Sequence, residues 1–403
     1  MAPPDLGSVL WATLAAYAGV VLIGGLLRSR VYAIFRLITL GLYGLIFWGL
    51  ARAWLATPLW PVFLYLHASV YLHSLMLVRP RLFPWLYRAL VSIPNSYFAA
   101  TMLLSWPWAV VSALGFAPWG FWLPAVVALF GVGQSLFTRP SEVHLVLDGD
   151  DRGQLARCEF GEGRAARPLS LMQITDPHLG PFMSVARLRA ICEHIVERKP
   201  DLVLLTGDYL TMESQRDPSH LRESLLPLRA LPGRCFACFG NHDHEAPETV
   251  KRALADAGVQ LLVDDATIVQ TDAGVVQILG MDYHYRDRAQ KMRAVLERHP
   301  RVSGAMRLVL LHHPGAFREL VEGEADLVLS GHTHGGQVGL LSLGLHVTML
   351  RLLMNSPDHG FWSQGRNRLY VHRGTGHYGF PLRVGVPAEQ SLVHVHRGDI
   401  GAA

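Results

Sequence analysis

Five polar clusters between residues 173 and 337 carry side chains that bind metal ions or transfer protons. Each cluster directly follows a short apolar run, in the segments QITDPH, LTGD, FGNHDH, LLHHP and LSGHTHGGQ. Their Asp, Asn and His residues are Asp176, His178, Asp208, Asn241, His242, Asp243, His244, His312, His313, His332 and His334. A single polar residue at a strand end is usually satisfied by its neighbours. Five clusters are hard to explain as packing, because burying so many polar groups without a shared partner is costly.

Two divalent cations would remove this cost. Mixed carboxylate, amide and imidazole ligands suit borderline ions such as Mn²⁺, Fe²⁺/Fe³⁺ or Zn²⁺. Two ions ~3.5–4 Å apart stabilise both the attacking and the leaving oxygen of a displacement, and a bound cation lowers the pKa of water towards ~7. The clusters therefore predict metal-assisted hydrolysis.

The apolar runs that precede the clusters are predicted to be strands of an α/β sandwich. LSLMQI, DLVLLT, RCFACF, VVQILG, RLVLLH and ADLVLS are almost continuously apolar, which is typical of strands covered on both faces. Residues 186–198, 246–257 and 287–299 between them show helical spacing. Ligands of open α/β sheets collect at the carboxyl ends of strands, where each polar cluster falls.

The ordered set DxH, GD, GNHD, H and GHTH resembles that of the calcineurin-like metallophosphoesterase superfamily. GHTHGGQ and the later YVHRGTGHYGFPLRVGVPAE are similar to its YkuE/YaeI-like branch. The resemblance covers about 141–395 and implies an α/β fold of the metallophosphoesterase αββα type. It departs from the family pattern at Pro177, where Leu is common, and in PAEQ, where Pro and Glu are often adjacent; neither removes a ligand.

The resemblance implies a role for each polar residue. One metal ion would be held by Asp176, His178 and His334, and the other by Asn241, His312 and His332. Asp208 would bind both ions. His242 would face the phosphoryl group as general acid or transition-state stabiliser, and Asp243 would orient it.

Three further residues are candidates for contacts with the substrate. The family pattern selects His312 rather than His313 as the ligand, which leaves His313 beside the metals or the substrate. Arg373 and His377 lie in RGTGH, whose glycines let a backbone approach a phosphate closely. Arg373 could equally pair with a carboxylate, since both are common roles for arginine.

The first third of the chain has a different character. The whole sequence is 50 % hydrophobic and 17 % charged, which is too apolar for an ordinary soluble enzyme. The excess lies in residues 1–138, and spans of a length suited to a bilayer are predicted at about 8–27, 32–55, 59–78, 97–115 and 118–138. A secretory signal is less favoured, because MAPPDLG has no basic residue and no cleavage site stands out. We therefore expect a helical transmembrane domain over 1–140 and a metallophosphoesterase domain over 141–403.

Basic residues flank the expected spans unevenly. Arg28, Arg30, Arg36, Arg79, Arg81, Arg88 and Arg139 would lie on one side, with only Arg52 on the other. The positive-inside tendency then predicts a catalytic domain in the cytoplasm, attached to a bacterial-type inner membrane. Four spans instead of five would reverse this side.

Two other features have competing interpretations. Cys235 and Cys238 form a CxxC, but in a strand this spacing puts them on opposite faces, which favours two packed core residues over a metal or redox site. Residues 338–354, VGLLSLGLHVTMLRLLM, are too short for a bilayer span. They are either a packed core element or a surface element in the membrane interface.

The favoured function is hydrolysis of a phosphodiester or pyrophosphate by a membrane-anchored, dimetal enzyme. The partners would be the lipid bilayer and a phosphorylated substrate, amphiphilic in the case of a UDP-diacylglucosamine, because the similar family includes such a pyrophosphatase. The alternatives are a phosphodiesterase for soluble nucleotides, a non-catalytic binding or scaffolding module, and a transporter. A non-catalytic module typically loses a ligand, and a transporter would need acidic residues that the spans lack. The net charge of +4 does not indicate nucleic-acid binding.

Overall fold

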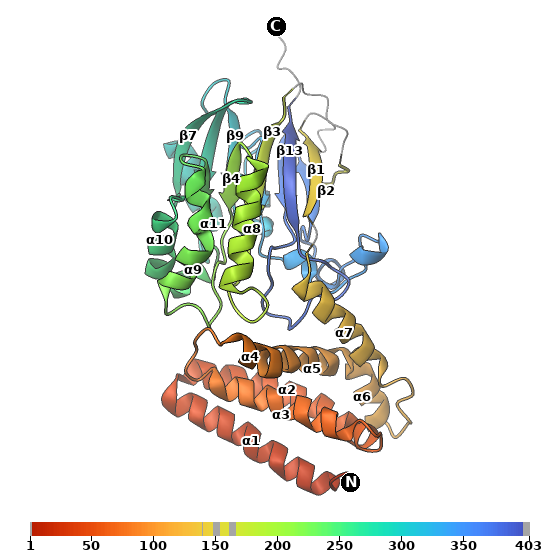
Figure 1. Cartoon of the computed structure of the whole chain (residues 1–403). Helices are drawn as coiled ribbons and strands as arrows, with labels where there is room; N and C mark the ends of the chain where they lie inside the picture. The colour runs from red at the N-terminus through yellow and green to blue at the C-terminus, as the bar shows by residue number, and fades with distance from the viewer. Residues whose placement is uncertain (1, 139, 148–153, 161–166, 398–403) are drawn as a thin grey trace. The chain divides into compact units, whose positions relative to one another are not determined.

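The computed structural model describes residues 2–138, 140–147, 154–160 and 167–397, which form two compact units. Unit 1 comprises Met1–Gln134 with Gly379–Val384, and unit 2 comprises Ser135–Tyr378 with Gly385–Ala403. Figure 1 shows helices in unit 1 and a mixture of strands and helices in unit 2. The segment Gly379–Val384 belongs to unit 1 although it lies far along the sequence, which composition did not predict.

Unit 2 is built on two β-sheets. The first sheet has the order β1-β13-β3-β4-β5-β6, and the second has the order β2-β11-β12-β10-β9-β8-β7. The strands of the first sheet are β1 (Pro140–Val146), β3 (Leu169–Ile174), β4 (Leu202–Leu205), β5 (Cys235–Ala237), β6 (Gln260–Leu261) and β13 (Gln390–His396). Those of the second are β2 (Ala156–Arg157), β7 (Asp265–Thr271), β8 (Gly274–Gly280), β9 (Met306–Leu310), β10 (Leu327–Ser330), β11 (Gly360–Gln364) and β12 (Asn367–Val371).

The strands that carry the polar clusters run parallel within each sheet. β3, β4, β5 and β6 are parallel neighbours, as are β8, β9, β10 and β12. Their carboxyl ends therefore meet along one edge of each sheet, where the loops that follow can contribute side chains to a single site.

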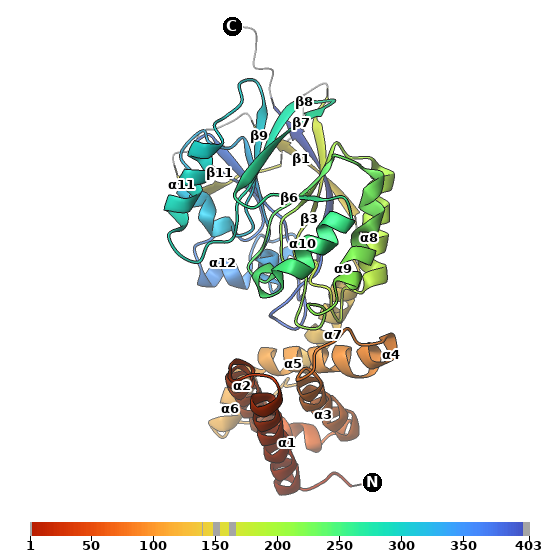
Figure 2. The same ribbon diagram turned by 90° about the vertical axis from the view of Figure 1, so that its left-hand side faces the viewer.

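Helices cover the outer faces of the two sheets. The helices of unit 2 that do so are α8 (Val185–Arg198), α9 (Pro218–Leu225), α10 (Pro247–Asp256) and α11 (Arg288–Arg298). Figure 2 shows α8, α9 and α10 on one side of the sheets and α11 on the other. One core lies between the sheets, a second packs the first sheet against α8, α9 and α10, and a third packs the second sheet against α11. This four-layer arrangement confirms the predicted αββα sandwich.

The spacing of apolar residues predicted three helices and the burial of two cysteines in unit 2. The three predicted helices are confirmed within a residue or two as α8, α10 and α11. Cys235 and Cys238 are also confirmed as free, buried core residues. Cys235 lies in the core beneath the helices and Cys238 lies in the core between the sheets, as the alternation of side chains along a strand requires.

Unit 1 is helical. Its helices are α1 (Leu6–Leu27), α2 (Arg30–Leu55), α3 (Trp60–Met76), α4 (Trp85–Tyr87), a π-helical turn (Arg88–Ser92), α5 (Ile93–Leu104), α6 (Trp106–Ala113) and α7 (Leu123–Leu136). By length and composition, α1 and α2 can cross a membrane. The segment expected as one span over 97–115 is divided at Ser105 into α5 and α6, with Pro107 in the first turn of α6. The five-span arrangement stays a prediction.

His67 is a buried polar group in the core of unit 1, and both of its ring nitrogens have hydrogen-bond partners there. Its Nδ1 lies 2.7 Å from the Tyr43 hydroxyl and its Nε2 lies 2.9 Å from Thr13 Oγ1. Its ring stacks on Phe47, with 3.6 Å between the ring centroids. These contacts give His67 a structural role in the core of unit 1.

Candidate metal centre

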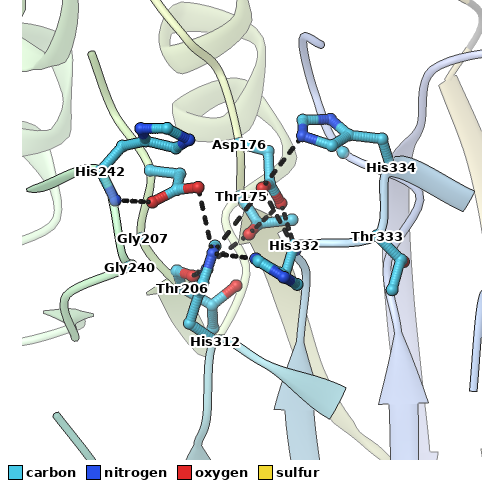
Figure 3. A network of polar contacts seen from close by, with 12 residues as sticks. Thr175, Asp176, Thr206, Gly207, Gly240, His242, His312, His332, Thr333 and His334 are labelled. Atoms are coloured by element: carbon cyan, nitrogen blue, oxygen red, sulfur yellow. Dashed lines mark hydrogen bonds and ion pairs between the residues drawn. The ribbon is translucent and has the colours of Figure 1, made fainter. Parts of the chain in front are cut away.

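Two groups of side chains converge at the carboxyl ends of the strands in unit 2. In the first group, ligand atoms of Asp176, His178 and His334 all lie within 4.8 Å of one another. In the second, the same holds for Asp208, His312 and His332. The residues come from the loops after β3, β4, β9 and β10, so both sheets contribute to the cluster. Figure 3 shows the side chains of Asp176, His312, His332 and His334 pointing toward one another.

Asp208 connects the two groups. Its Oδ2 lies 3.1 Å from His312 Nε2 in its own group and 3.7 Å from His178 Nε2 in the other. Asp176 completes the first group, with its Oδ1 3.5 Å from His334 Nε2. The two groups are therefore adjacent, and one carboxylate reaches both.

The backbone at these positions is strained. Five of the six residues adopt left-handed φ angles, at Asp176 (51°), His178 (46°), Asp208 (58°), His332 (67°) and His334 (51°). Residues other than glycine rarely adopt this conformation, and it persists only where the surrounding structure enforces it. Such a concentration of strain is typical of a functional site rather than of packing.

Two glycines allow the loops to approach one another this closely. A Cβ atom at Gly331 would lie 2.1 Å from Thr175 Oγ1 and 2.2 Å from Asp176 Oδ2. A Cβ atom at Gly240 would lie 2.2 Å from Asp208 Oδ1. The glycines of SGHTH and GNHD are therefore required by the contact between neighbouring loops.

The hydrogen bonds of the histidines direct lone pairs into the cluster. His178 Nδ1 lies 3.2 Å from the carbonyl oxygen of Leu210, and His312 Nδ1 lies 2.6 Å from that of Thr206. A carbonyl can only accept, so each Nδ1 carries a proton and each Nε2 faces the cluster, where it can bind a cation once it is deprotonated. Backbone carbonyls commonly orient metal-binding histidines in this way.

Unsatisfied buried atoms show that the cluster fits cations. His178 Nε2 and Asn241 Oδ1 are buried and have no hydrogen-bond partner among the described residues. The backbone on both sides of Asn241 is fixed by hydrogen bonds. The N–H of Gly240 donates to Asp243, and the N–H of His242 donates to Asp208. Buried polar atoms without partners are costly, and a bound cation would satisfy both.

The pKa values of the clustered residues also indicate a site that suits cations. Burial raises the pKa of Asp176 to about 6, and the nearby charge of Asp208 contributes. Burial also lowers the pKa of His178 to about 4 and that of His332 to about 2. Burial opposes a charge on His312, but the Asp208 carboxylate outweighs it and raises the pKa of His312 to about 10. Without a cation, the cluster therefore holds its buried negative charge by placing a proton on His312.

Comparisons with known proteins identify the family. The calcineurin-like phosphoesterase family matches residues 169–336. "Phosphodiesterase YaeI" of Escherichia coli (strain K12) is 30 % identical over 231 residues, which cover 56 % of this chain and 82 % of that protein. The chain belongs to the calcineurin-like phosphoesterase family. It is a metallophosphoesterase with phosphodiesterase and pyrophosphatase relatives.

Of two further relatives, one is named as a pyrophosphatase and the other as a transmembrane protein. "UDP-2,3-diacylglucosamine pyrophosphatase LpxG" of Chlamydia muridarum (strain MoPn / Nigg) is 26 % identical over 262 residues, covering 52 % of this chain and 78 % of that protein. "Transmembrane protein with metallophosphoesterase domain" of Danio rerio is 28 % identical over 241 residues, covering 55 % of this chain and 52 % of that protein.

His242 of this phosphoesterase lies at the edge of the cluster and is held by two carboxylates. Its backbone N–H donates to Asp208 Oδ1 at 2.8 Å, and its ring Nδ1 lies 2.7 Å from Glu245 Oε1. Burial lowers the pKa of His242, but the hydrogen bond to Glu245 and the charge of Asp208 outweigh it, so the pKa is raised. The ring is therefore suited to carry a proton.

The structure gives Asp243 a different task from orienting this ring. Its carboxylate accepts the backbone N–H groups of Asp208 and Gly240, each at 2.7 Å, and of Tyr209 at 3.0 Å. Asp243 thereby ties the loop after β4 to the loop after β5. The carboxylate that contacts the His242 ring is that of Glu245, three residues on in GNHDHE, which the sequence did not single out.

The three candidate substrate residues are placed differently from one another. His313 lies beside the second group, with its ring 4.4 Å from that of His332, and its Nδ1 accepts the N–H of Gly315. Arg373 Nε lies 3.1 Å from Glu389 Oε2, so the structure shows the carboxylate pairing that the sequence left open. His377 is buried, with its ring 4.9 Å from that of Phe182.

Two tyrosines that the sequence did not single out border the cluster. Tyr378 stacks on His178 with 5.1 Å between centroids, and its ring meets that of His242 edge-on at 5.2 Å. Tyr283 lies on the side of the second group, with its ring 6.2 Å from that of His332. No metal-binding residue type marks them, so only the fold reveals their position.

Proposed function

We propose that this chain is a membrane-anchored phosphoesterase that hydrolyses a phosphodiester or pyrophosphate bond with two divalent cations. Asp176, His178 and His334 would hold one ion. Asn241, His312 and His332 would hold the other, and Asp208 would bind both. The observation that carries this proposal is the meeting of the two groups at Asp208, whose carboxylate reaches histidines of each.

The cations would supply Lewis acidity for the phosphoryl oxygens and generate the nucleophile from water at neutral pH. Residues of this chain would do the rest. His242 would donate a proton to the leaving oxygen, with Glu245 holding its ring through Nδ1 so that Nε2 faces outward. Asp243 would keep the loops that carry Asp208 and Asn241 in register.

We infer that the substrate is an amphiphilic phosphoester. Two features support this: α1 and α2 can anchor the chain in a bilayer, and a relative is named for the hydrolysis of a UDP-linked diacylglucosamine. A soluble nucleotide diester is the second candidate, which the relative named as a phosphodiesterase supports. A scaffolding role is disfavoured because the chain retains every residue of both groups.

We further propose that the chain resides in a bacterial-type inner membrane with unit 2 in the cytoplasm. The support is the arginines at the junction of α1 and α2 (Arg28 and Arg30) and between α3 and α5 (Arg79, Arg81 and Arg88).

The test is hydrolysis by the full chain, purified in detergent and supplied with Mn²⁺. Bis-p-nitrophenyl phosphate, p-nitrophenyl phosphate and a UDP-linked diacylglucosamine are compared as substrates. Asp208→Asn is expected to lower the rate by about 10³-fold or more and to reduce the bound Mn²⁺, because it removes the carboxylate shared by both ions. Asp217→Asn, at the exposed N-cap of α9, is the matched control and should change neither. Wild-type activity in the Asp208→Asn variant would refute the dimetal proposal.

A further inference from the structure

An apolar surface adjoins the metal centre of unit 2. It is formed by residues 340–354, here called the apolar patch, which include η6 (Leu341–Leu343) and α12 (Met349–Leu353). Neither element has a buried residue, and Leu343, Leu352 and Leu353 are 74 %, 69 % and 75 % exposed. The other exposed apolar side chains of the patch are Leu340, Leu345, Val347, Met349 and Met354. The segment is therefore a surface element, and its interpretation as a packed core element is wrong.

The patch is anchored to the loop that carries His332 and His334. Thr348 is fully buried, and its Oγ1 donates to Asp358 Oδ2 at 2.7 Å. Thr333, between the two histidines, donates through its Oγ1 to the carbonyl oxygen of Asp358 at 2.6 Å. The exposed leucines thus extend from a firmly held base, and the position of the patch is coupled to the metal loop.

The composition of the patch indicates what covers it. Soluble proteins rarely expose this many neighbouring aliphatic side chains unless they mark a binding surface. Energetically dominant residues of protein–protein interfaces are enriched in Trp, Tyr and Arg and poor in Leu, whereas residues 338–354 contain no Trp or Tyr, a single arginine (Arg351) and many leucines. They also contain no Asp or Glu. Long aliphatic side chains without acidic neighbours suit the acyl boundary of a bilayer better than a protein surface.

Basic residues at the base of the patch suit the headgroups of anionic lipids. Arg351 of α12 is exposed and donates to Asn355 Oδ1 at 3.1 Å, and the exposed Arg318 donates to the carbonyl oxygen of Asn355 at 2.6 Å. Two guanidinium groups are thereby held together beside the aliphatic side chains. Basic residues next to inserted apolar residues strengthen binding to anionic membranes.

The bilayer is also the surface to which the chain is attached. α1 and α2 are long and apolar enough to cross it, so unit 2 is tethered close to lipid by its own sequence. Tethering raises the effective concentration of the second partner, so a modest patch is sufficient for binding.

We propose that the apolar patch docks on the lipid bilayer in which the chain is anchored, inserting its leucines at the level of the headgroups. Docking would hold the metal loop at the membrane surface, where the phosphoester of an amphiphilic substrate lies. The docking stands independently of the enzyme's substrate, whereas this consequence for the substrate rests on the proposed function.

The docking is tested by placing a fluorophore on the patch of the full chain. Leu353→Cys is labelled with an environment-sensitive fluorophore in a Cys158→Ser background, because the other three cysteines are buried. The protein is reconstituted in vesicles of phosphatidylcholine and phosphatidylglycerol that contain nitroxide-labelled lipid. Ile268→Cys on β7, at a site that is 58 % exposed, is the matched control.

Nitroxide lipid is expected to quench the fluorophore at residue 353 by about twofold or more and to leave residue 268 unchanged, since quenching requires insertion to the acyl boundary. Equal quenching at both positions would overturn the proposal. A fluorophore at residue 353 that is shielded from water but not quenched would also overturn it, because a protein surface would then cover the patch.

The consequence for the substrate is tested with the double variant Leu343→Glu and Leu353→Glu. Hydrolysis of a UDP-linked diacylglucosamine in vesicles should fall by about tenfold, because the carboxylates oppose insertion, while hydrolysis of bis-p-nitrophenyl phosphate stays within about twofold. The double variant Ile268→Glu and Val321→Glu, at sites 58 % and 55 % exposed, is the matched control and should retain both activities.

Equal losses on both substrates would contradict the role of the patch in reaching lipid substrates. A wild-type chain that hydrolyses neither substrate would instead refute the proposed function, and the quenching experiment would still decide the docking.

Discussion

At the scale of single residues, His242 depends on two carboxylates that do different things. Asp208 accepts the backbone N–H of His242 and so fixes the position of its backbone. Glu245 contacts the imidazole ring and so fixes its orientation. Glu245 is held in turn, because its other oxygen accepts from Gln215 Nε2 at 2.7 Å. The orientation of the proposed acid therefore rests on a residue outside the metal cluster.

Replacing Glu245 should impair the reaction without affecting the metal ions. Glu245→Ala is expected to lower kcat by about tenfold or more with little change in KM, because a misplaced catalytic group costs rate even when binding is intact. Glu245→Gln keeps an oxygen that can accept from Nδ1 and should restore most of kcat. Bound metal, measured by elemental analysis, should equal that of the wild type in both variants.

A double-mutant cycle separates this positioning role from general damage. In a His242→Asn background, Glu245→Ala should cause no further loss, because the group that it orients is already gone. Glu248→Ala, which removes a nearby exposed carboxylate paired with Lys251, should leave kcat unchanged. A full additional loss in the His242→Asn background would show that Glu245 acts in some other way.

The candidate ligands could be predicted from the sequence because their type and order along the chain are distinctive. Asp176, Asp208 and His334 each follow a strand, and parallel strands bring such positions together. The tasks of Asp243 and Glu245 could not be predicted, since GNHDHE places both carboxylates close to His242. Only the turn after β5 decides which of them faces the ring and which faces the backbone.

At the scale of elements, the site is made by loops that touch at glycine. The loop after β10 passes so close to the loop after β3 that Gly331 has no room for a side chain. This contact is what brings His332 and His334 to Asp176. The backbone N–H of His332 donates to Asp176 Oδ2 at 2.9 Å, which fastens the two loops together.

Adding a methyl group at Gly331 should therefore separate the loops. Gly331→Ala is expected to weaken metal binding by more than about tenfold and to lower the free energy of unfolding by about 1–3 kcal/mol, as overpacking does. Metal titration and thermal unfolding measure the two effects. Gly304→Ala is the control, because its Cβ meets open space at a φ of 77°, and it should cost about 1–2 kcal/mol of stability while metal affinity stays normal. Wild-type metal affinity in Gly331→Ala would show that the loop contact does not shape the site.

Long elements with a clear pattern were predictable, and short ones were not. α8 and α11 have apolar residues at helical spacing, and the pattern of each ended within a residue or two of the helix. β2 and β6 have two residues each, too few to show any alternation. The break between α5 and α6 lies next to Pro107. Whether a proline interrupts an apolar helix depends on whether neighbouring helices satisfy the freed backbone groups, so the local sequence alone did not predict this break.

At the scale of the whole molecule, the chain consists of an apolar unit and a catalytic unit with different compositions. The composition of the sequence changes near residue 140, and the two compact units divide between Gln134 and Ser135. The membership of Gly379–Val384 in unit 1 was not readable, because it arises from tertiary contacts. Gly131, for example, is so close to this segment that a Cβ atom would lie 2.9 Å from the carbonyl oxygen of Arg383.

Contacts within unit 1 also bear on how the chain is oriented in the membrane. Arg28, after α1, donates to the carbonyl oxygen of Leu77, after α3, so the ends of these two helices lie together. Arg30, Arg79 and Arg81 are close to these ends in sequence. The basic segments are thereby gathered at one end of the helices, which is the arrangement that the positive-inside tendency requires.

This orientation predicts which residues a membrane-impermeant maleimide can reach in spheroplasts. In a Cys158→Ser background, Ala117→Cys, in the exposed segment between α6 and α7, should be labelled while the membrane is intact. Ile268→Cys in unit 2 should be labelled only after detergent opens the membrane, because the proposed orientation would keep the arginine-rich segments and the domain that follows α7 on the cytoplasmic side. The background variant without an added cysteine should give no signal, since its three remaining thiols are buried. Labelling of Ile268→Cys in intact spheroplasts would place unit 2 outside the cytoplasm and refute the proposed orientation.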